Sequence, residues 1–274
     1  MKEHEWNTYI DLCEKDVLKA NNYRHSLVPN ILYKYYPLFD DKEESKERLN
    51  SVRQGKLWMS THKSLNDPID LTPFYLDEEK LRKRNYPSEL IELLDSFLNG
   101  FAKDTMVICS FTTNSLDSML MWAHYANNHK GFCVAYEVKN PKYMWDVHYQ
   151  KRRLGISGAV TNLIYDDSSD ENRRGKYAAI LLQQALVKGK DWEYEHEYRI
   201  IQYKDNFPEF NEYGGLVNAT FAGVKALKIV AGWKCAYKNQ LSEIARELNC
   251  QISTVKPSKR EFRMEEEYYG SPKV

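Results

Sequence analysis

Apolar residues recur along this chain either with the period of a helix or in short runs of strand length. The helical period predicts helices over residues 5–22, 40–54, 78–104, 118–127, 174–187 and 238–248. Apolar and aromatic runs, bounded by glycine, proline or asparagine, predict strands at 31–36, 56–60, 106–111, 131–138, 193–203, 217–222, 226–230 and 251–255, with one or two more within 145–166 that end at 163–165.

The order of these elements predicts the fold class. Long helices do not alternate regularly with the strands, which argues against a doubly wound parallel sheet. Short strands with inserted helices instead predict an α+β fold with mixed, largely antiparallel short-strand sheets. No repeat, low-complexity tract or linker interrupts the sequence, so we expect a single domain over residues 1–274. Within it, we expect residues 1–28 to be an N-terminal helical extension, 29–203 the core and 204–274 the C-terminal part.

The composition indicates an aromatic core and no overall charge. Hydrophobic residues make up 42% of the chain, and 20 tyrosines and 6 tryptophans supply much of the apolar area. The 39 acidic and 39 basic side chains balance, whereas a general nucleic-acid binder is expected to carry a basic excess. Residues 151–153 (Lys-Arg-Arg) and 173–174 (Arg-Arg) are densely basic, and we interpret both first as solvated faces.

The cysteines and the N-terminal residues indicate the cellular compartment in which the protein works. The five cysteines are scattered and show no C-x-x-C spacing, which disfavours a zinc ribbon and suits a reducing environment. The N-terminal residues are charged, and no window approaches the roughly 18 apolar residues that a membrane span needs. We therefore expect a soluble cytoplasmic protein with no membrane partner.

Most familiar cofactor motifs are absent from the sequence. It contains no G-x-x-x-x-G-K-[ST], no G-x-G-x-x-G, no H-E-x-x-H and no G-x-S-x-G. The seven histidines are too dispersed to suggest a metal site by spacing, so no metal is predicted.

The segment 192–199 (Trp-Glu-Tyr-Glu-His-Glu-Tyr-Arg) holds the best catalytic candidates. If it is a strand, Glu193, Glu195, Glu197 and Arg199 point to one face. Three neighbouring carboxylates repel one another, and one arginine offsets only part of that repulsion. A chemical interpretation is a pair in a pocket, with one carboxylate orienting a hydroxyl and the other stabilising a cationic transition state. The alternative is a solvent-facing strand whose acids only aid solubility.

Two other segments contain polar candidates. Ser60 and Thr61 end a predicted strand, where ligands often bind. Asn66 and Asp67 follow in a turn, which they could instead hold through side-chain to backbone bonds. His124 shares no helix face with the next histidine, five residues on, so packing is as reasonable a role for it as catalysis.

Several motifs together resemble those of a bacterial family of unknown function. They are Leu-Tyr-Lys-Tyr at 32–35, Leu-Trp-Met-Ser at 57–60 with Asn-Asp-Pro at 66–68, Cys-Ser-Phe at 109–111, Met-Trp-Ala-His-Tyr at 121–125 with Gly131, and Trp-x-x-Glu-x-Glu-Tyr-Arg at 192–199. The resemblance covers residues 31 to about 203. It implies a role in phage defence or in a toxin system, which members of that family are often suspected to have.

The order of the motifs also resembles that of ADP-ribosyltransferases, which bear an Arg or His on a first strand, a Ser, Thr or Tyr at a strand end and a late Glu. This resemblance implies an ADP-ribosyltransferase-like fold and NAD as co-substrate. In the first position this chain has a lysine, which offers a point charge instead of the arginine fork. By position, the resemblance assigns catalysis to Glu197 and Glu195, NAD binding to Lys34, Tyr35, Ser60, Thr61, Asn66 and Arg199, and substrate binding to Asp67, His124 and Tyr125.

Three hypotheses about function remain open. The first is an enzyme that cleaves NAD and transfers ADP-ribose to an RNA, DNA or protein acceptor, as a bacterial toxin or phage-defence effector with an antitoxin or another defence-system protein as partner. The second is a non-catalytic sensor whose acidic strand and aromatic surface bind a partner protein. The third is a metal-dependent nuclease with Asp67, Glu195 and Glu197 as oxygen ligands.

Overall fold

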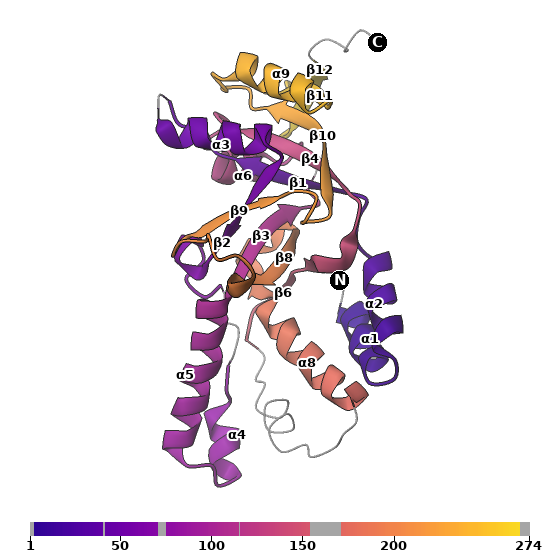
Figure 1. The fold of residues 1–274 in the computed structure, drawn as a ribbon, viewed down its shortest axis with the longest axis vertical. Coiled ribbons are helices and arrows are strands. Elements are labelled where there is room, and N and C mark those ends of the chain that lie inside the picture. The colour runs from indigo at the N-terminus through magenta and orange to yellow at the C-terminus, as the bar shows by residue number, and fades with distance from the viewer. Residues whose placement is uncertain (1–2, 41, 71–74, 115, 154–170, 269–274) are drawn as a thin grey trace.

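A curled, branched sheet forms the centre of the fold in the computed structural model (Figure 1). The structure describes residues 3–40, 42–70, 75–114, 116–153 and 171–268. The strands of this sheet are β1 (Ile31–Tyr36), β2 (Lys56–Ser60), β3 (Met106–Thr112), β4 (Phe132–Val138), β5 (Met144–Asp146), β8 (Glu197–Tyr203), β9 (Gly214–Asn218), β10 (Val224–Ala231), β11 (Gln251–Pro257) and β12 (Met264–Tyr268).

The strand order is β12–β11–β10–β4–β1–β3–β2–β9, and β8 pairs with β3 and β5 outside this row. All of these pairs are antiparallel except β10 with β11. A separate parallel pair consists of β6 (His148–Gln150) and β7 (Val187–Gly189). The predicted α+β class and the largely antiparallel pairing are therefore confirmed.

The sheet branches at β3. One edge of β3 pairs with β8 along its whole length, and the other edge pairs with β2 near its middle and with β1 at its end. Thr112, the last residue of β3, consequently lies opposite Glu197 of β8 and opposite Tyr33 of β1. This register brings the ends of three strands together at one place.

Helices cover the sheet in groups (Figure 1). The helices are α1 (Glu3–Cys13), α2 (Val17–Ser26), α3 (Glu43–Arg53), α4 (Glu78–Lys83), α5 (Ser88–Thr105), α6 (Met119–Tyr125), α8 (Glu171–Ala185) and α9 (Lys238–Glu247), with short 3-10 helices η1 (His62–Ser64), η2 (Pro141–Tyr143), η3 (Lys190–Glu195) and η4 (Lys204–Asn206). Helix α1 packs against α2 and α8, α3 against α9, and α6 against β1. The hairpin of α4 and α5 extends away from the sheet.

The core lies on both faces of β1, because successive strand residues point in opposite directions. Leu32 and Tyr36 belong to the largest apolar cluster, which includes Leu241 of α9. Tyr35 belongs to a second cluster with Trp122 of α6. Both faces of this central strand are therefore covered.

Two of the predicted helices are each divided in the structure. The helix expected over 5–22 breaks between α1 and α2, where Asp16 Oδ1 accepts a hydrogen bond from the Lys19 backbone at 3.0 Å and caps α2. The helix expected over 78–104 breaks between α4 and α5, where Asn85 has a φ of 62° and Pro87 precedes α5.

The prediction that a strand begins at residue 193 is wrong, although its end at residue 203 is confirmed. Residues Lys190–Glu195 form η3, and His196 has a left-handed φ of 44°, so β8 starts only after it. Thr112 Oγ1 at the end of β3 donates a hydrogen bond to the carbonyl of Glu195 and holds this turn. Tertiary contacts therefore override the alternating sequence pattern.

The C-terminal part also differs from prediction. β9 begins at Gly214 and ends before the turn at 219–223, so only the first two residues of the strand expected at 217–222 are extended. No strand is predicted after 251–255, yet β12 pairs with β11. The strand expected to end at 163–165 lies outside the described residues. No helix in the described ranges combines the length and apolarity that a membrane crossing requires.

Candidate active site

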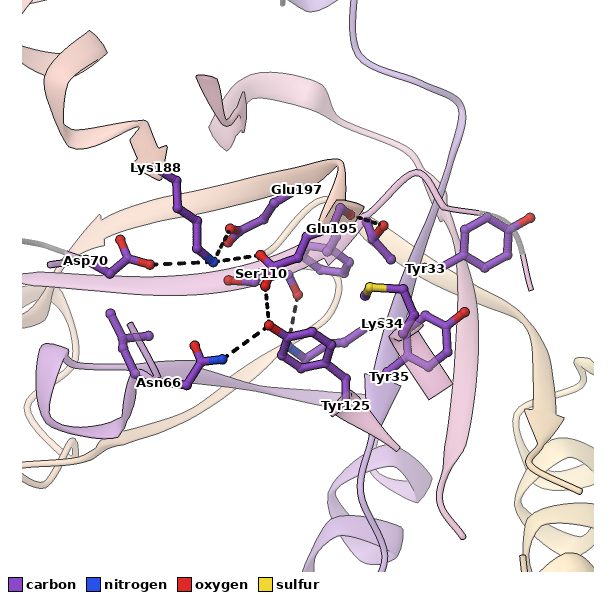
Figure 2. A pocket seen from close by; sticks show the side chains of 14 residues that line it. Tyr33, Lys34, Tyr35, Asn66, Asp70, Ser110, Tyr125, Lys188, Glu195 and Glu197 are labelled. Atoms are coloured by element: carbon purple, nitrogen blue, oxygen red, sulfur yellow. Dashed lines mark hydrogen bonds and ion pairs between the residues drawn. The ribbon is translucent and has the colours of Figure 1, made fainter. Parts of the chain in front are cut away.

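A cavity of about 120 Å³ opens where β1, β3 and β8 meet (Figure 2). The loop after η1, helix α6 and strand β7 complete its walls. The lining residues are Tyr33, Lys34, Tyr35, Leu65, Asn66, Asp70, Ser110, Phe111, Thr112, Met121, Tyr125, Lys188, Glu195 and Glu197. Segments more than 100 residues apart along the chain thus share one cavity.

Glu195 and Glu197 both line this cavity, although only Glu197 belongs to a strand. They are 4% and 3% exposed. The left-handed residue between them, His196, changes the chain direction. Asn114 Nδ2 donates a hydrogen bond to the backbone carbonyl just before Glu195, so the end of β3 fixes the position of the pair.

Two buried cations bind the two carboxylates. Arg199 donates from Nε to Glu197 Oε1 at 2.8 Å and from Nη2 to Glu197 Oε2 at 2.9 Å. Lys188 Nζ bridges the pair, at 2.6 Å from Glu195 Oε2 and 3.1 Å from Glu197 Oε2. Arg199 also donates to both carboxylate oxygens of Asp70, at 2.6 and 2.7 Å. Removing charges from water is costly, so such a dense buried group is better evidence for function than for stability.

Tyr125 continues the network on the other side of Glu195. Its hydroxyl donates a hydrogen bond to Glu195 Oε1 and accepts one from Asn66 Nδ2 at 3.2 Å. Burial raises the pKa of Tyr125, and the neighbouring Glu195 raises it further, so the phenol stays protonated at neutral pH. A continuous chain of hydrogen bonds therefore runs from Asn66 through Tyr125 and Lys188 to both glutamates (Figure 2). Arg199, behind the cavity, continues it from Glu197 to Asp70.

The surroundings of the two glutamates move their pKa values in opposite directions. Burial raises the pKa of Glu195 above its usual value of 4.5, although Lys188 acts against this effect. Burial also favours a high pKa for Glu197, but Arg199 and Lys188 outweigh it and lower the pKa to about 2. Neighbouring carboxyl groups with separated pKa values are typical of acid and base pairs in enzymes. Glu197 thus stays ionised at neutral pH, and Glu195 is the better proton acceptor.

Lys34 is, with Lys188, the second lysine of the lining. Its Nζ donates a hydrogen bond to the backbone carbonyl of Ser110 at 3.1 Å and lies 5.7 Å from the ring centre of Phe111. Within the described ranges, no ion pair links Lys34 to a carboxylate. This ammonium group therefore has hydrogen-bonding capacity left for an anionic ligand.

The structure brings some of the predicted site residues together and leaves others apart. The cavity lining contains six of them, namely Lys34, Tyr35, Asn66, Tyr125, Glu195 and Glu197. Arg199 lies behind the cavity, fully buried against Glu197. Asp67 lines a second, adjoining cavity.

The three remaining predicted site residues, like Arg199 and Asp67, lie outside the lining. Ser60 pairs with Ile108 and Gly214 in the sheet. Thr61 Oγ1 donates a hydrogen bond to the backbone carbonyl of Glu212 at 2.6 Å. The ring of His124 packs against those of Tyr125 and Tyr194. In the cavity, hydroxyl groups come instead from Ser110 and Thr112 on β3.

Sequence reasoning missed two charged residues of the network, Asp70 and Lys188. Asp70 follows the predicted turn at 66–68 by two residues. Because Asn, Asp and Pro already explained this segment as a turn, no feature of the sequence assigned Asp70 to the site. Lys188 ends the apolar run 185–188 (Ala-Leu-Val-Lys), and a lysine beside buried apolar residues is the one signal that could have marked it.

The carboxylates of Glu197 and Asp67 are engaged in hydrogen bonds within the protein and are not arranged to bind a metal ion. Both oxygens of Glu197 accept hydrogen bonds from Arg199, and Asp67 Oδ1 accepts one from the Ile69 backbone at 2.9 Å. In the part of the chain that the structure describes, no group of three His, Cys, Asp or Glu residues is arranged to hold a metal ion.

Comparison with known proteins shows a similarity to one protein family but indicates no activity. The model of a family described as "Protein of unknown function (DUF2971)" matches residues 121–200. This stretch includes most of α6, with Tyr125, and the glutamate pair. No curated protein and no solved structure matches the chain. Part of this chain, with much of the candidate site, is therefore similar to a family of unknown function.

Proposed function

We propose that this protein is an ADP-ribosyltransferase-like enzyme that cleaves NAD and transfers ADP-ribose to an acceptor. One observation carries the proposal: a buried glutamate pair with opposite pKa shifts lies in an aromatic cavity that also contains Lys34. The resemblance in motif order to ADP-ribosyltransferases supports the same conclusion.

Glu197 suits the bond-breaking step. When the bond between the nicotinamide nitrogen and the anomeric carbon breaks, its electron pair leaves with nicotinamide, which departs as a neutral molecule. Positive charge develops on the ribose, as in glycoside hydrolysis. A carboxylate that stays ionised stabilises this charge, and more strongly in a buried site than in water. Glu197 has that property because Arg199 and Lys188 hold its pKa low.

Glu195 suits the transfer step. The acceptor nucleophile forms a bond to the anomeric carbon and must lose a proton. A carboxylate with a raised pKa is a stronger base than an ordinary one, so Glu195 is the acceptor of that proton. Tyr125 and Lys188 each bind one of its oxygens and fix its orientation.

The remaining lining residues suit a flat, charged ligand. Tyr33, Tyr35 and Phe111 offer aromatic surface to the nicotinamide ring. Lys34 can meet a phosphate oxygen. The cavity volume of about 120 Å³ is below the roughly 300 Å³ of typical ligand pockets, so only the nicotinamide and ribose end would enter it.

The two other hypotheses have less support. A sensor that binds through solvated acids needs an exposed strand, but Glu195 and Glu197 are buried. A nuclease needs carboxylate oxygens for its metal ion, but Arg199 occupies those of Glu197, and Asp67 does not line the cavity of the glutamates.

Nicotinamide release from NAD by the purified protein tests the proposal. Glu197→Gln keeps the shape of the side chain but removes its charge, and we expect it to lower the release rate at least about 100-fold. Glu193→Gln is the matched control, because Glu193 is exposed and its carboxylate pairs with exposed Lys190. If the wild type neither releases nicotinamide nor binds NAD in calorimetry, the proposal is wrong. Equal rates for Glu197→Gln and the wild type would also overturn it.

The biological setting is part of the same proposal. The resemblance to a family suspected of phage defence favours a bacterial toxin or defence effector, with RNA, DNA or a protein as acceptor. An antitoxin or another defence-system protein would then be its partner. Such an effector would slow the growth of a bacterial host in its wild-type form and not as Glu197→Gln.

A further inference from the structure

A second cavity, of about 230 Å³, adjoins the glutamate cavity. The two cavities share Asp70 and Lys188 as lining residues. The parallel pair of β6 and β7 builds this second cavity, because it aligns Tyr149 with Lys188 and Gln150 with Gly189. The chain that leaves β6 therefore passes directly beside the lysine that binds both glutamates.

The rim of this cavity is basic. Lys151, Arg152 and Arg153 follow β6, line the cavity and are exposed. Two of the three acids in the lining are buried and engaged, since Asp70 binds Arg199 and Asp67 accepts a backbone hydrogen bond. Asp191 is the exposed acid of the lining. Three exposed cations thus outnumber one exposed acid at the rim.

An aromatic ring stands beside these cations. Trp192 in η3 lines the second cavity and is half-buried, with its ring centre 5.0 Å from Lys188 Nζ. Proteins that bind single-stranded nucleic acids without sequence preference combine cationic side chains, which bind phosphates, with aromatic rings on which bases stack. The same two kinds of side chain can bind a single nucleotide.

We propose that the second cavity binds a nucleotide, with its phosphate against Lys151, Arg152 and Arg153 and its base against Trp192. As a subsite of the enzyme described above, it rests on the proposed function, and it accommodates the part of the substrate for which the glutamate cavity is too small. The nucleotide comes either from the ADP half of NAD or from a single-stranded nucleic-acid acceptor. Both sources present the same chemistry to the rim.

Calorimetry with two probes, ADP and an eight-nucleotide oligo-dT, tests the site. Lys151→Gln/Arg152→Gln removes two rim charges, and we expect it to weaken probe binding at least about tenfold and to reduce the dependence of binding on salt. Arg173→Gln/Arg174→Gln removes the same charge from two exposed residues of α8 that line neither cavity, and it should bind as the wild type does. Trp192→Leu should weaken binding, and Trp192→Phe should largely restore it.

The outcomes separate the two sources. Binding of ADP alone identifies the ADP half of NAD, and tighter binding of oligo-dT identifies a single-stranded acceptor. If the wild type binds neither probe, or if Lys151→Gln/Arg152→Gln binds within twofold of the wild type, the nucleotide site is wrong.

The same samples, assayed for nicotinamide release, distinguish this failure from failure of the proposed function. Probe binding with the expected losses but without nicotinamide release supports the nucleotide site and refutes NAD cleavage. Nicotinamide release that persists without probe binding supports NAD cleavage and refutes the nucleotide site.

Discussion

Glu195 and Glu197 share Lys188 but differ in their other contacts. Arg199 binds both oxygens of Glu197, whereas Glu195 has a neutral phenol, Tyr125, as its second partner. A full positive charge stabilises an ionised carboxylate more than a phenol does. The difference explains why one pKa falls and the other rises although both side chains are buried.

Glu197 should make stability depend on pH in acid. Its pKa falls from 4.5 to about 2 on folding, so its ionised form stabilises the fold above pH 4.5. That stabilisation is lost as pH falls through the window from about 4.5 to about 2. Each tenfold change in proton affinity is worth about 1.4 kcal/mol, so the full effect is on the order of 3 kcal/mol.

Urea unfolding of the wild type and of Glu197→Gln measures this effect. We expect the wild type to be more stable by roughly 3 kcal/mol at pH 6, because the variant leaves Arg199 without one buried partner. The difference should be about 1 kcal/mol smaller at pH 3.5, where the unfolded chain already binds the proton. A difference that does not change between these two pH values contradicts a depressed pKa for Glu197.

The two glutamates and their partners Arg199 and Tyr125 could be predicted as site residues from the sequence, but Lys188 and Asp70 could not. The sequence shows Glu195, Glu197 and Lys34 in suitable motifs. Lys188 and Asp70 join them only because β7 and the loop after η1 meet at the same cavity. No local pattern encodes that meeting, since both segments depend on long-range pairing.

At the scale of elements, the turn between η3 and β8 determines where the glutamates lie. Thr112 Oγ1 donates a hydrogen bond to the carbonyl of Glu195, and both groups are buried. Thr112→Val keeps the side-chain volume but leaves that carbonyl without its donor. We expect a loss of unfolding free energy of about 1 to 3 kcal/mol together with reduced nicotinamide release.

Thr113→Val is the matched control on the same strand end. The Thr113 hydroxyl makes only a longer, exposed contact of 3.5 Å with the His196 carbonyl, so little stability or activity should be lost. Equal effects of the two substitutions, measured by urea unfolding and nicotinamide release, would show that the end of β3 does not hold the turn.

Elements with one dominant local signal could be predicted, and elements shaped by tertiary contacts could not. β1 and β2 match their predicted ranges because each is a short run of apolar and aromatic residues with clear boundaries. Residues 193–196 alternate as a strand would, but hydrogen bonds from Thr112 of β3 and from Asn114 just after it hold them in a turn. β12 is rich in glutamate and is extended because it pairs with β11 and places Glu266 within 2.7 Å of Lys228 Nζ.

At the scale of the whole molecule, zero net charge conceals a strong separation of charge. Buried acids line one cavity, and exposed cations line the rim of the next. The branch of the sheet at β3 and the pair of β6 with β7 bring these opposite surfaces together. Composition alone therefore indicates charge balance but not where a polar substrate would bind.

A crystal structure with a non-hydrolysable NAD analogue tests the central claim most directly. We expect density for the nicotinamide and its ribose between Tyr33–Tyr35, Asn66 and the glutamate pair, with the anomeric carbon facing Glu197. Density elsewhere on the molecule, or an empty cavity at saturating analogue, would contradict an NAD-cleaving centre at Glu195 and Glu197.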